Sequence, residues 1–133
     1  MLWSYEARNT DECQLLQTVA RNAPIIVTNM HERVIGVSIE WCAMCQYSSD
    51  EAFSTTPGIL QGPMTNLEAA RDLSMQVRRG ASTFTSLVNY KKDGTPFVNH
   101  LYAYALGDLL VAETYAETAT QEVDAVSVCG WRL

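Results

Sequence analysis

The chain of 133 residues is short of positive charge. It has 9 lysines and arginines against 15 aspartates and glutamates, which gives a formal net charge of −6. Proteins that bind nucleic acids or anionic membranes through phosphate contacts need a surplus of basic side chains. We therefore expect neither nucleic acid nor a membrane surface among the partners of this domain.

Long apolar runs are also missing. No stretch of about 18 apolar residues occurs, so the sequence predicts no transmembrane helix. The first residues, MLWSYEARNTDE, lack the basic region and apolar core of a secretory signal. We expect an intracellular protein, cytoplasmic or nuclear. The length and a hydrophobic content of 47% predict one ordinary domain with a buried core.

Cysteine is scarce and unevenly placed, at Cys13, Cys42, Cys45 and Cys129. This usage does not suit a secreted fold stapled by disulfides and favours a reducing compartment. Cys42 and Cys45 form a C-x-x-C, the spacing of a redox-active pair in thioredoxin-like proteins. No βαβ unit surrounds it, and no second C-x-x-C completes a zinc site. We expect both thiols to pack as small hydrophobic groups in a helix.

Groupings typical of catalysis are missing as well. The two histidines, His31 and His100, are isolated, and no Ser/His/Asp set or paired carboxylates can be recognised. We therefore expect no enzymatic activity and no metal site.

What the sequence does contain is a clear series of local structural signals. Ser48 and Glu51 fit a helix capping box, Gly80 suits a left-handed helix end, and Asp93-Gly94 suits a tight hairpin turn. These signals and the apolar spacing predict helices over 10–21, 40–47, 48–53 and 65–80, and strands over 25–29, 34–38, on both sides of the 93–94 turn within 83–106, and over 108–117.

The order of these elements predicts an α+β fold. Strands and helices come in separate groups, which favours a five-stranded antiparallel sheet with short helices packed on one face. We expect an N-terminal flanking helix within 1–23, a core over 24–117 and a C-terminal flanking segment over 118–133.

This order resembles that of a PAS domain, and specific stretches resemble the LOV branch, the flavin-binding blue-light receptors. LVNYKKDGTPFVNHL (87–101) closely resembles the LOV hairpin that carries two flavin-binding asparagines. YSSDEAF and ILQGP resemble the stretch before that hairpin, and IIVTN and LLVAE resemble the first and last strands. The resemblance covers roughly residues 24 to 117 and implies the five-stranded PAS fold.

The resemblance implies a pocket for FMN or another flavin. It places Gln61, Asn89 and Asn99 at the polar side of the flavin, and Ile26 and Thr28 beside it on the first strand. Amide side chains suit this task because each one both donates and accepts hydrogen bonds.

The sequence also departs from the LOV pattern. The cysteine that forms the light-induced bond to the flavin falls on Pro57, which has no thiol. Two arginines that contact the flavin phosphate fall on Gly58 and Ser74. Losing charge-assisted contacts weakens the hold on a phosphate, so riboflavin should suffer less than FMN.

Two further positions differ near the expected ring. Trp41 falls where LOV domains usually carry phenylalanine; it either packs in the core or lies close enough to donate an electron to an excited flavin. The glutamine of the last strand falls on Glu113, or on Thr114 if the register slips by one residue. A charged carboxylate facing a buried ring is costly.

The leading hypothesis is a sensory or interaction PAS module of LOV type that cannot form the cysteinyl bond to flavin. One alternative is a flavin-free PAS domain that dimerises or acts as a scaffold. Another is a small flavin redox protein, which the C-x-x-C and Trp41 keep open. We expect a homodimer, or contact with a partner protein or output domain, through the sheet face and the flanking segments.

Overall fold

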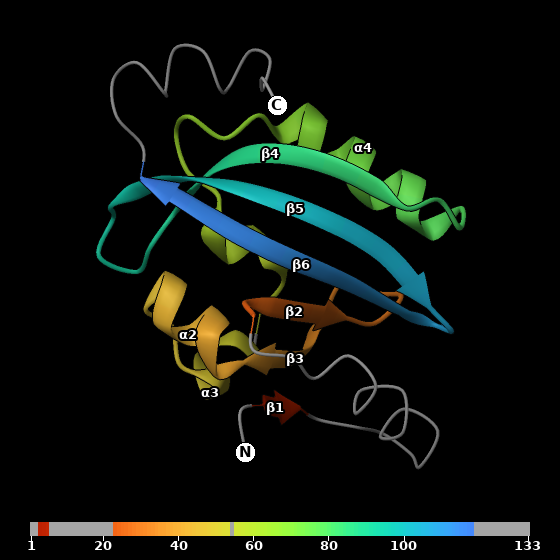
Figure 1. Cartoon of the computed structure of the whole chain (residues 1–133), viewed down its shortest axis with the longest axis horizontal. Coiled ribbons are helices and arrows are strands. Elements are labelled where there is room, and N and C mark those ends of the chain that lie inside the picture. The colour runs from red at the N-terminus through yellow and green to blue at the C-terminus, as the bar shows by residue number, and fades with distance from the viewer. Residues whose placement is uncertain (1–2, 6–22, 54, 119–133) are drawn as a thin grey trace.

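The computed structural model describes residues 3–5, 23–53 and 55–118. Within these ranges the strands form one antiparallel sheet in the order β1-β3-β2-β6-β5-β4 (Figure 1). The described elements, in chain order, are β1 (Trp3–Tyr5), β2 (Ile25–Thr28), β3 (Val34–Ser38), α2 (Ile39–Cys45), α3 (Ser49–Phe53), the 3₁₀ helix η1 (Pro57–Leu60), α4 (Leu67–Arg78), β4 (Thr83–Tyr90), β5 (Pro96–Leu106) and β6 (Leu109–Thr118).

The predicted α+β fold with a five-stranded antiparallel sheet is confirmed, and β1 adds a sixth strand in the described part of the chain. β1 lies within the segment expected to be a flanking helix, and it pairs with the outer edge of β3. An unpaired strand edge exposes backbone donors and acceptors, and this pairing satisfies them. The predicted helix over 10–21 and nearly all of the segment 118–133 lie outside the described residues, so the domain boundaries stay predictions.

The predicted capping box and the two predicted glycine positions are present in the structure. The backbone N–H of Ser48 donates to Glu51 Oε1 at 3.0 Å, and the Glu51 N–H donates to Ser48 Oγ at 3.1 Å, a complete capping box. Gly80 and Gly94 have φ of 91° and 90°, a region that favours glycine. These two residues close α4 and the β4–β5 turn.

The β4–β5 turn is docked on the end of α2. Gln46 follows this helix with a left-handed φ of 72°. Its side chain donates to Asp93 Oδ2 at 3.2 Å and accepts from the Asp93 N–H at 3.1 Å. The backbone N–H of Lys92 donates to Cys45 O at 3.0 Å, and its side chain lies 2.6 Å from Glu51 Oε2. These contacts fix the hairpin relative to α2 and α3.

Helices α2, α3, η1 and α4 lie on one face of the sheet (Figure 1). The core on this face is a cluster of buried side chains from β2, β3 and the helices: Ile26, Val34, Val37, Trp41, Cys45, Ala52 and Leu60. A second buried cluster is formed by Ile25, Val27, Ile35, Leu109 and Val111. Successive side chains of a strand point to opposite faces, so β2, buried at every position, contributes to both clusters.

The longest described helix is α4, with 12 residues. Among the described residues, none of the helices combines the length and the apolar character needed to cross a membrane.

Candidate functional site

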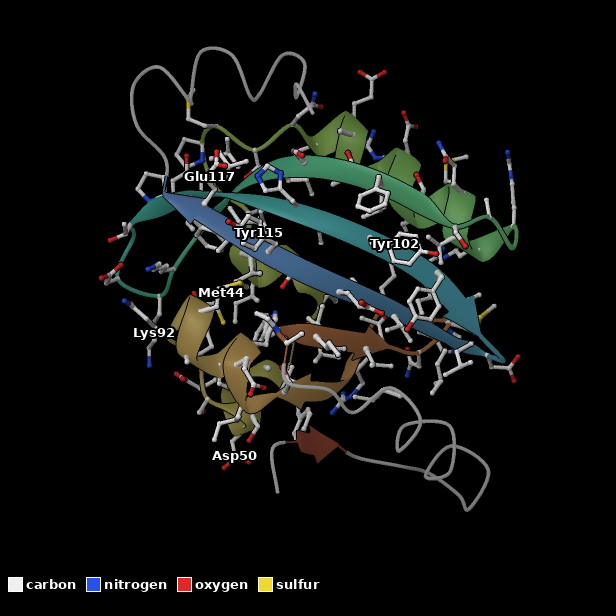
Figure 2. All side chains as sticks on the ribbon, in the orientation of Figure 1. Met44, Asp50, Lys92, Tyr102, Tyr115 and Glu117 are labelled. Atoms are coloured by element: carbon white, nitrogen blue, oxygen red, sulfur yellow. The ribbon has the colours of Figure 1, made fainter. Side chains whose placement is uncertain are left out.

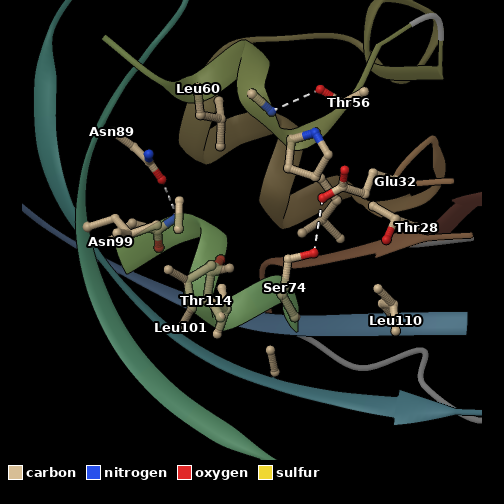
Figure 3. Close-up of a pocket in the computed structure, with 18 of the residues that line it drawn as sticks. Thr28, Glu32, Thr56, Leu60, Ser74, Asn89, Asn99, Leu101, Leu110 and Thr114 are labelled. Carbon is tan, nitrogen blue, oxygen red and sulfur yellow. Dashed lines mark hydrogen bonds between the residues drawn. The ribbon is translucent and has the colours of Figure 1, made fainter. Parts of the chain in front are cut away.

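A cavity of about 290 Å³ lies between the sheet and the helices (Figure 3). Its volume is just below the range of small-molecule sites, roughly 300–1,000 Å³. The wall is mostly apolar and comes from β2, β4, β5, β6, α2, η1 and α4. The polar residues in the wall are Thr28, Glu32, Thr56, Gln61, Ser74, Asn89, Asn99 and Thr114.

Two asparagines form a pair at one end of this pocket. Asn89 on β4 pairs with Phe97 and Asn99 on β5 pairs with Leu87, so the two amides are diagonal neighbours on one face. Asn99 Nδ2 donates to Asn89 Oδ1 at 3.0 Å, and Asn89 Nδ2 donates to Val88 O at 3.2 Å. Both side chains are buried, and Asn99 Oδ1 has no hydrogen-bond partner among the described residues.

Trp41 brings a second buried polar atom to the wall. Ser38 caps α2 by accepting from the Trp41 N–H at 3.1 Å, and this places the fully buried indole in the core. The indole Nε1 also lacks a partner within the described part of the chain. A buried polar group without a partner costs about 1–3 kcal/mol, and native structures keep few of them. Asn99 and Trp41, which carry these two atoms, both line the pocket.

The last strand places Thr114 in the pocket, not Glu113. Thr114 is opposite Leu101, which also lines the pocket, whereas Glu113 is opposite Tyr102. Glu113 accepts from the Tyr104 hydroxyl at 3.1 Å. The expectation that Glu113 lies at the pocket is wrong, because the alternation of β6 turns this side chain to the opposite face, where the carboxylate keeps a polar partner. Thr114 Oγ1 donates to Pro24 O at 3.1 Å.

The segment around η1 forms another side of the pocket. Pro57 begins this helix, where its missing N–H costs nothing, and Thr56 Oγ1 accepts from the Gly58 N–H at 3.2 Å. Gln61, the residue after η1, lines the pocket and is exposed to solvent, so it lies at the mouth, the end of the pocket that opens to solvent.

The glycine of the Leu60-Gln61-Gly62-Pro63 motif has a steric reason. A Cβ atom on Gly62 would lie 2.3 Å from a ring carbon of Tyr90. The Tyr90 hydroxyl accepts from the Met64 N–H at 2.9 Å, and Thr65 Oγ1 donates to Val88 O. The motif thus lies directly against β4, which carries Asn89.

The mouth also carries a residue that sequence reasoning missed. Glu32, in the β2–β3 turn, is the one charged residue among the described residues of the wall. Its Oε1 accepts from Ser74 Oγ at 3.0 Å, and its Oε2 lies 3.2 Å from Arg78 Nη2. Glu32 and Ser74 are 42 residues apart, so no local sequence pattern predicts this contact.

All the predicted site residues except Glu113 line this one pocket. They are Ile26, Thr28, Trp41, Pro57, Gln61, Asn89 and Asn99. The residues come from β2, α2, η1, β4 and β5 and the loop after η1, and the fold alone brings them together.

The C-x-x-C lies outside the pocket wall. Cys42 and Cys45 are both free, and Cys45 is fully buried. Burial raises the pKa of the Cys45 thiol to about 11 and raises the pKa of Cys42 above its ordinary value. A reactive cysteine needs the opposite shift. In the described ranges, no group of His, Cys, Asp and Glu could hold a metal ion.

No family model matches the chain. Protein TWIN LOV 1 of Arabidopsis thaliana is 31% identical over 64 residues, which are 48% of this chain and 16% of that protein. The chain therefore spans less than a fifth of the length of this curated relative.

Solved structures show the same architecture. A LOV domain of a blue-light activated histidine kinase from Erythrobacter litoralis superposes with a TM-score of 0.69 at 21% identity, over 75% of this chain and 100% of that one. The LOV protein of Rhodobacter sphaeroides gives 0.74 at 16% identity, over 87% and 72%. The light-state LOV domain of Aureochrome1 gives 0.68 at 22% identity, over 87% and 94%. The chain thus has the PAS fold in the form found in LOV domains.

Proposed function

We propose that this chain is a sensory PAS module of LOV type whose pocket binds a flavin without a covalent bond to cysteine. The observation that carries the proposal is the buried Asn89–Asn99 pair, in which Asn99 Oδ1 faces no partner among the described residues. The polar edge of a flavin ring alternates donors and acceptors in one plane, and an amide pair can match such an edge. The resemblance of the hairpin to that of LOV domains supports the same assignment.

A bound flavin would supply blue-light absorption and a redox-active ring. In this chain Asn89 and Asn99 would hold the polar edge, while Leu60 and Leu101 would pack against the ring. Pro57 lines the wall where a reactive thiol is expected, and no cysteine is found among the described residues of the wall. We therefore propose a signal that does not depend on a cysteinyl bond, and no catalytic role for this domain.

The output surface we propose is the sheet face opposite the helices. Phe84 and Tyr115 on this face are 74% and 66% exposed. The rings of Phe84 and Tyr102 are 5.0 Å apart, and those of Tyr102 and Tyr104 are 5.5 Å apart. Figure 2 shows Tyr102 and Tyr115 on this face. Exposed aromatic surface of this kind favours a second copy of the chain or a partner protein.

The experiment that tests flavin binding is a titration of the purified chain with riboflavin, followed by quenching of flavin fluorescence. We expect saturable binding, weakened by at least about tenfold in Asn99→Leu, which removes the acceptor and keeps a similar volume. The matched control is Asn66→Asp, which changes the exposed cap of α4 and should leave binding unchanged. Absence of binding to the unmodified chain would contradict the proposal and leave the flavin-free scaffold.

A further inference from the structure

The two ends of the pocket differ in chemistry. Figure 3 shows the Asn89–Asn99 pair at one end and Glu32 with Ser74 toward the other. The amide end is buried and uncharged. The other end opens to solvent and carries the carboxylate of Glu32. A ligand that places its polar ring edge on the amides would direct its substituent toward this carboxylate.

The mouth offers no positive charge to a ligand. Among the described residues of the wall there is no lysine, arginine or histidine. Arg78 lies nearby but is engaged by Glu32, with Nη2 3.2 Å from Oε2. A phosphate monoester carries about 1.5–2 negative charges near neutral pH. Such a group would meet the Glu32 carboxylate, and Arg78 is already paired with that carboxylate.

The Glu32 carboxylate is held in place. The backbone N–H of Glu32 donates to Asn29 O at 3.0 Å, and the residue has a left-handed φ of 63°. Its side chain is fixed to α4 by Ser74 and Arg78. The turn fixes the backbone of Glu32 and α4 fixes its side chain. The carboxylate therefore cannot move away from an incoming anion without breaking its contacts with Ser74 and Arg78.

The same end suits hydroxyl groups. Thr28, Thr56 and Ser74 present hydroxyls in the wall, and a carboxylate accepts readily from a ligand hydroxyl. An uncharged polyol chain could exchange hydrogen bonds with these groups. Selection in favour of a hydroxyl and against a charge is a common route to specificity.

We propose that the pocket selects a flavin whose side chain ends in hydroxyls and rejects one that ends in a phosphate, so that riboflavin is preferred over FMN. Glu32, held by Ser74 and Arg78, is the specificity-determining residue. This inference rests on the proposed flavin-binding function and adds the class of ligand.

The test compares riboflavin and FMN in parallel fluorescence titrations of the full chain. We expect riboflavin to bind at least about tenfold more tightly than FMN at low salt, and the ratio to fall as salt screens the exposed carboxylate. Glu32→Gln removes the repulsion and releases Arg78, so FMN affinity should rise by about tenfold. Riboflavin affinity should fall, but by less than about tenfold, because the glutamine amide oxygen still accepts from a ligand hydroxyl although it carries no charge.

The matched control is Asp72→Asn, which changes net charge by the same amount on the exposed side of α4, away from the pocket wall. We expect no change in the preference for riboflavin over FMN. Equal affinity for both flavins in the unmodified chain, or equal gains in Asp72→Asn and Glu32→Gln, would overturn the inference while leaving the proposed function intact. Binding of neither flavin would overturn both.

Discussion

The two faces of the β4–β5–β6 sheet treat their polar groups differently. On the outer face these groups pair with one another: Tyr104 with Glu113, and His100 with Ser86 and Glu117. On the inner face Asn99 donates a hydrogen bond to Asn89. The Asn99 side-chain oxygen, however, has no partner among the described residues. The inner face thus carries an acceptor without a protein partner in a residue of the pocket wall, and we propose that the polar edge of a flavin lies there.

The largest effect on the inner face is expected from Pro57→Cys, because light-induced bleaching of the bound flavin should be present in this variant and absent in the unmodified protein. Residue 57 is the first position of η1 and lines the inner pocket, so a cysteine fits without loss of a backbone bond. In flavin-loaded variant protein, blue light should bleach the visible flavin bands, and darkness should restore them, since orientation beside the ring decides the reaction.

The unmodified, flavin-loaded protein is the control for Pro57→Cys and should keep its visible absorbance. Persistent absorbance in the variant would mean that residue 57 is not beside the ring or that Trp41 quenches the excited state first. The double variant Pro57→Cys with Trp41→Phe separates these two explanations.

A second prediction concerns the buried thiol of the inner core. Burial raises the folded-state pKa of Cys45 from 9.0 to about 11. The unfolded chain therefore loses this proton first as pH rises, and the free energy of unfolding falls between pH 9.0 and about 11. The size of the loss should be about 3 kcal/mol, because each pKa unit corresponds to about 1.4 kcal/mol.

The measurement is denaturant unfolding across this pH range for the unmodified chain and Cys45→Ala. The stability difference between them should shrink as pH rises. Cys42→Ala, at the half-buried neighbour, should show a smaller change. A difference that is constant with pH would show that the Cys45 thiol ionises normally and that this part of the inner core is open to water.

The amide pair itself can be tested by the double variant Asn89→Leu with Asn99→Leu. Replacing both partners of a buried polar pair by apolar groups of similar size can stabilise a protein, and here it also removes the unpartnered acceptor. We expect the free energy of unfolding of the flavin-free protein to rise by about 1–2 kcal/mol while flavin binding is lost. A large loss of stability would instead assign the pair to the structural core.

The smallest effect is expected on the outer face. Tyr104→Phe removes one hydrogen bond to the half-exposed Glu113 and should lower the free energy of unfolding by about 0.5–1 kcal/mol. Flavin affinity should not change. An effect on flavin affinity as large as that of Asn99→Leu would break the distinction between the two faces.

Much of the fold could be predicted because its signals are local. The capping box of Ser48 and Glu51 and the Asp93-Gly94 turn each need only a few consecutive residues. The two asparagines also stood out, because this residue is depleted in strands. Their convergence with Gln61 could be expected only through the resemblance to LOV domains.

The features that sequence reasoning missed depend on distant contacts. The three-residue strand β1 exists through pairing with β3. The register of β6 was ambiguous because Leu109, Leu110 and Val111 are apolar in succession and give no alternation to read. Glu32 joins the pocket through α4, far away in sequence.

One hydroxyl described above ties the first part of the sheet to the helices. Besides capping α2, Ser38 Oγ accepts from the Ile25 N–H at 2.9 Å and donates to Ala23 O at 2.7 Å. The backbone N–H groups of Ile25 and Trp41 therefore donate to the same buried oxygen atom. We therefore expect β2, β3 and the start of α2 to open together in hydrogen exchange, and this opening would expose the indole that lines the pocket.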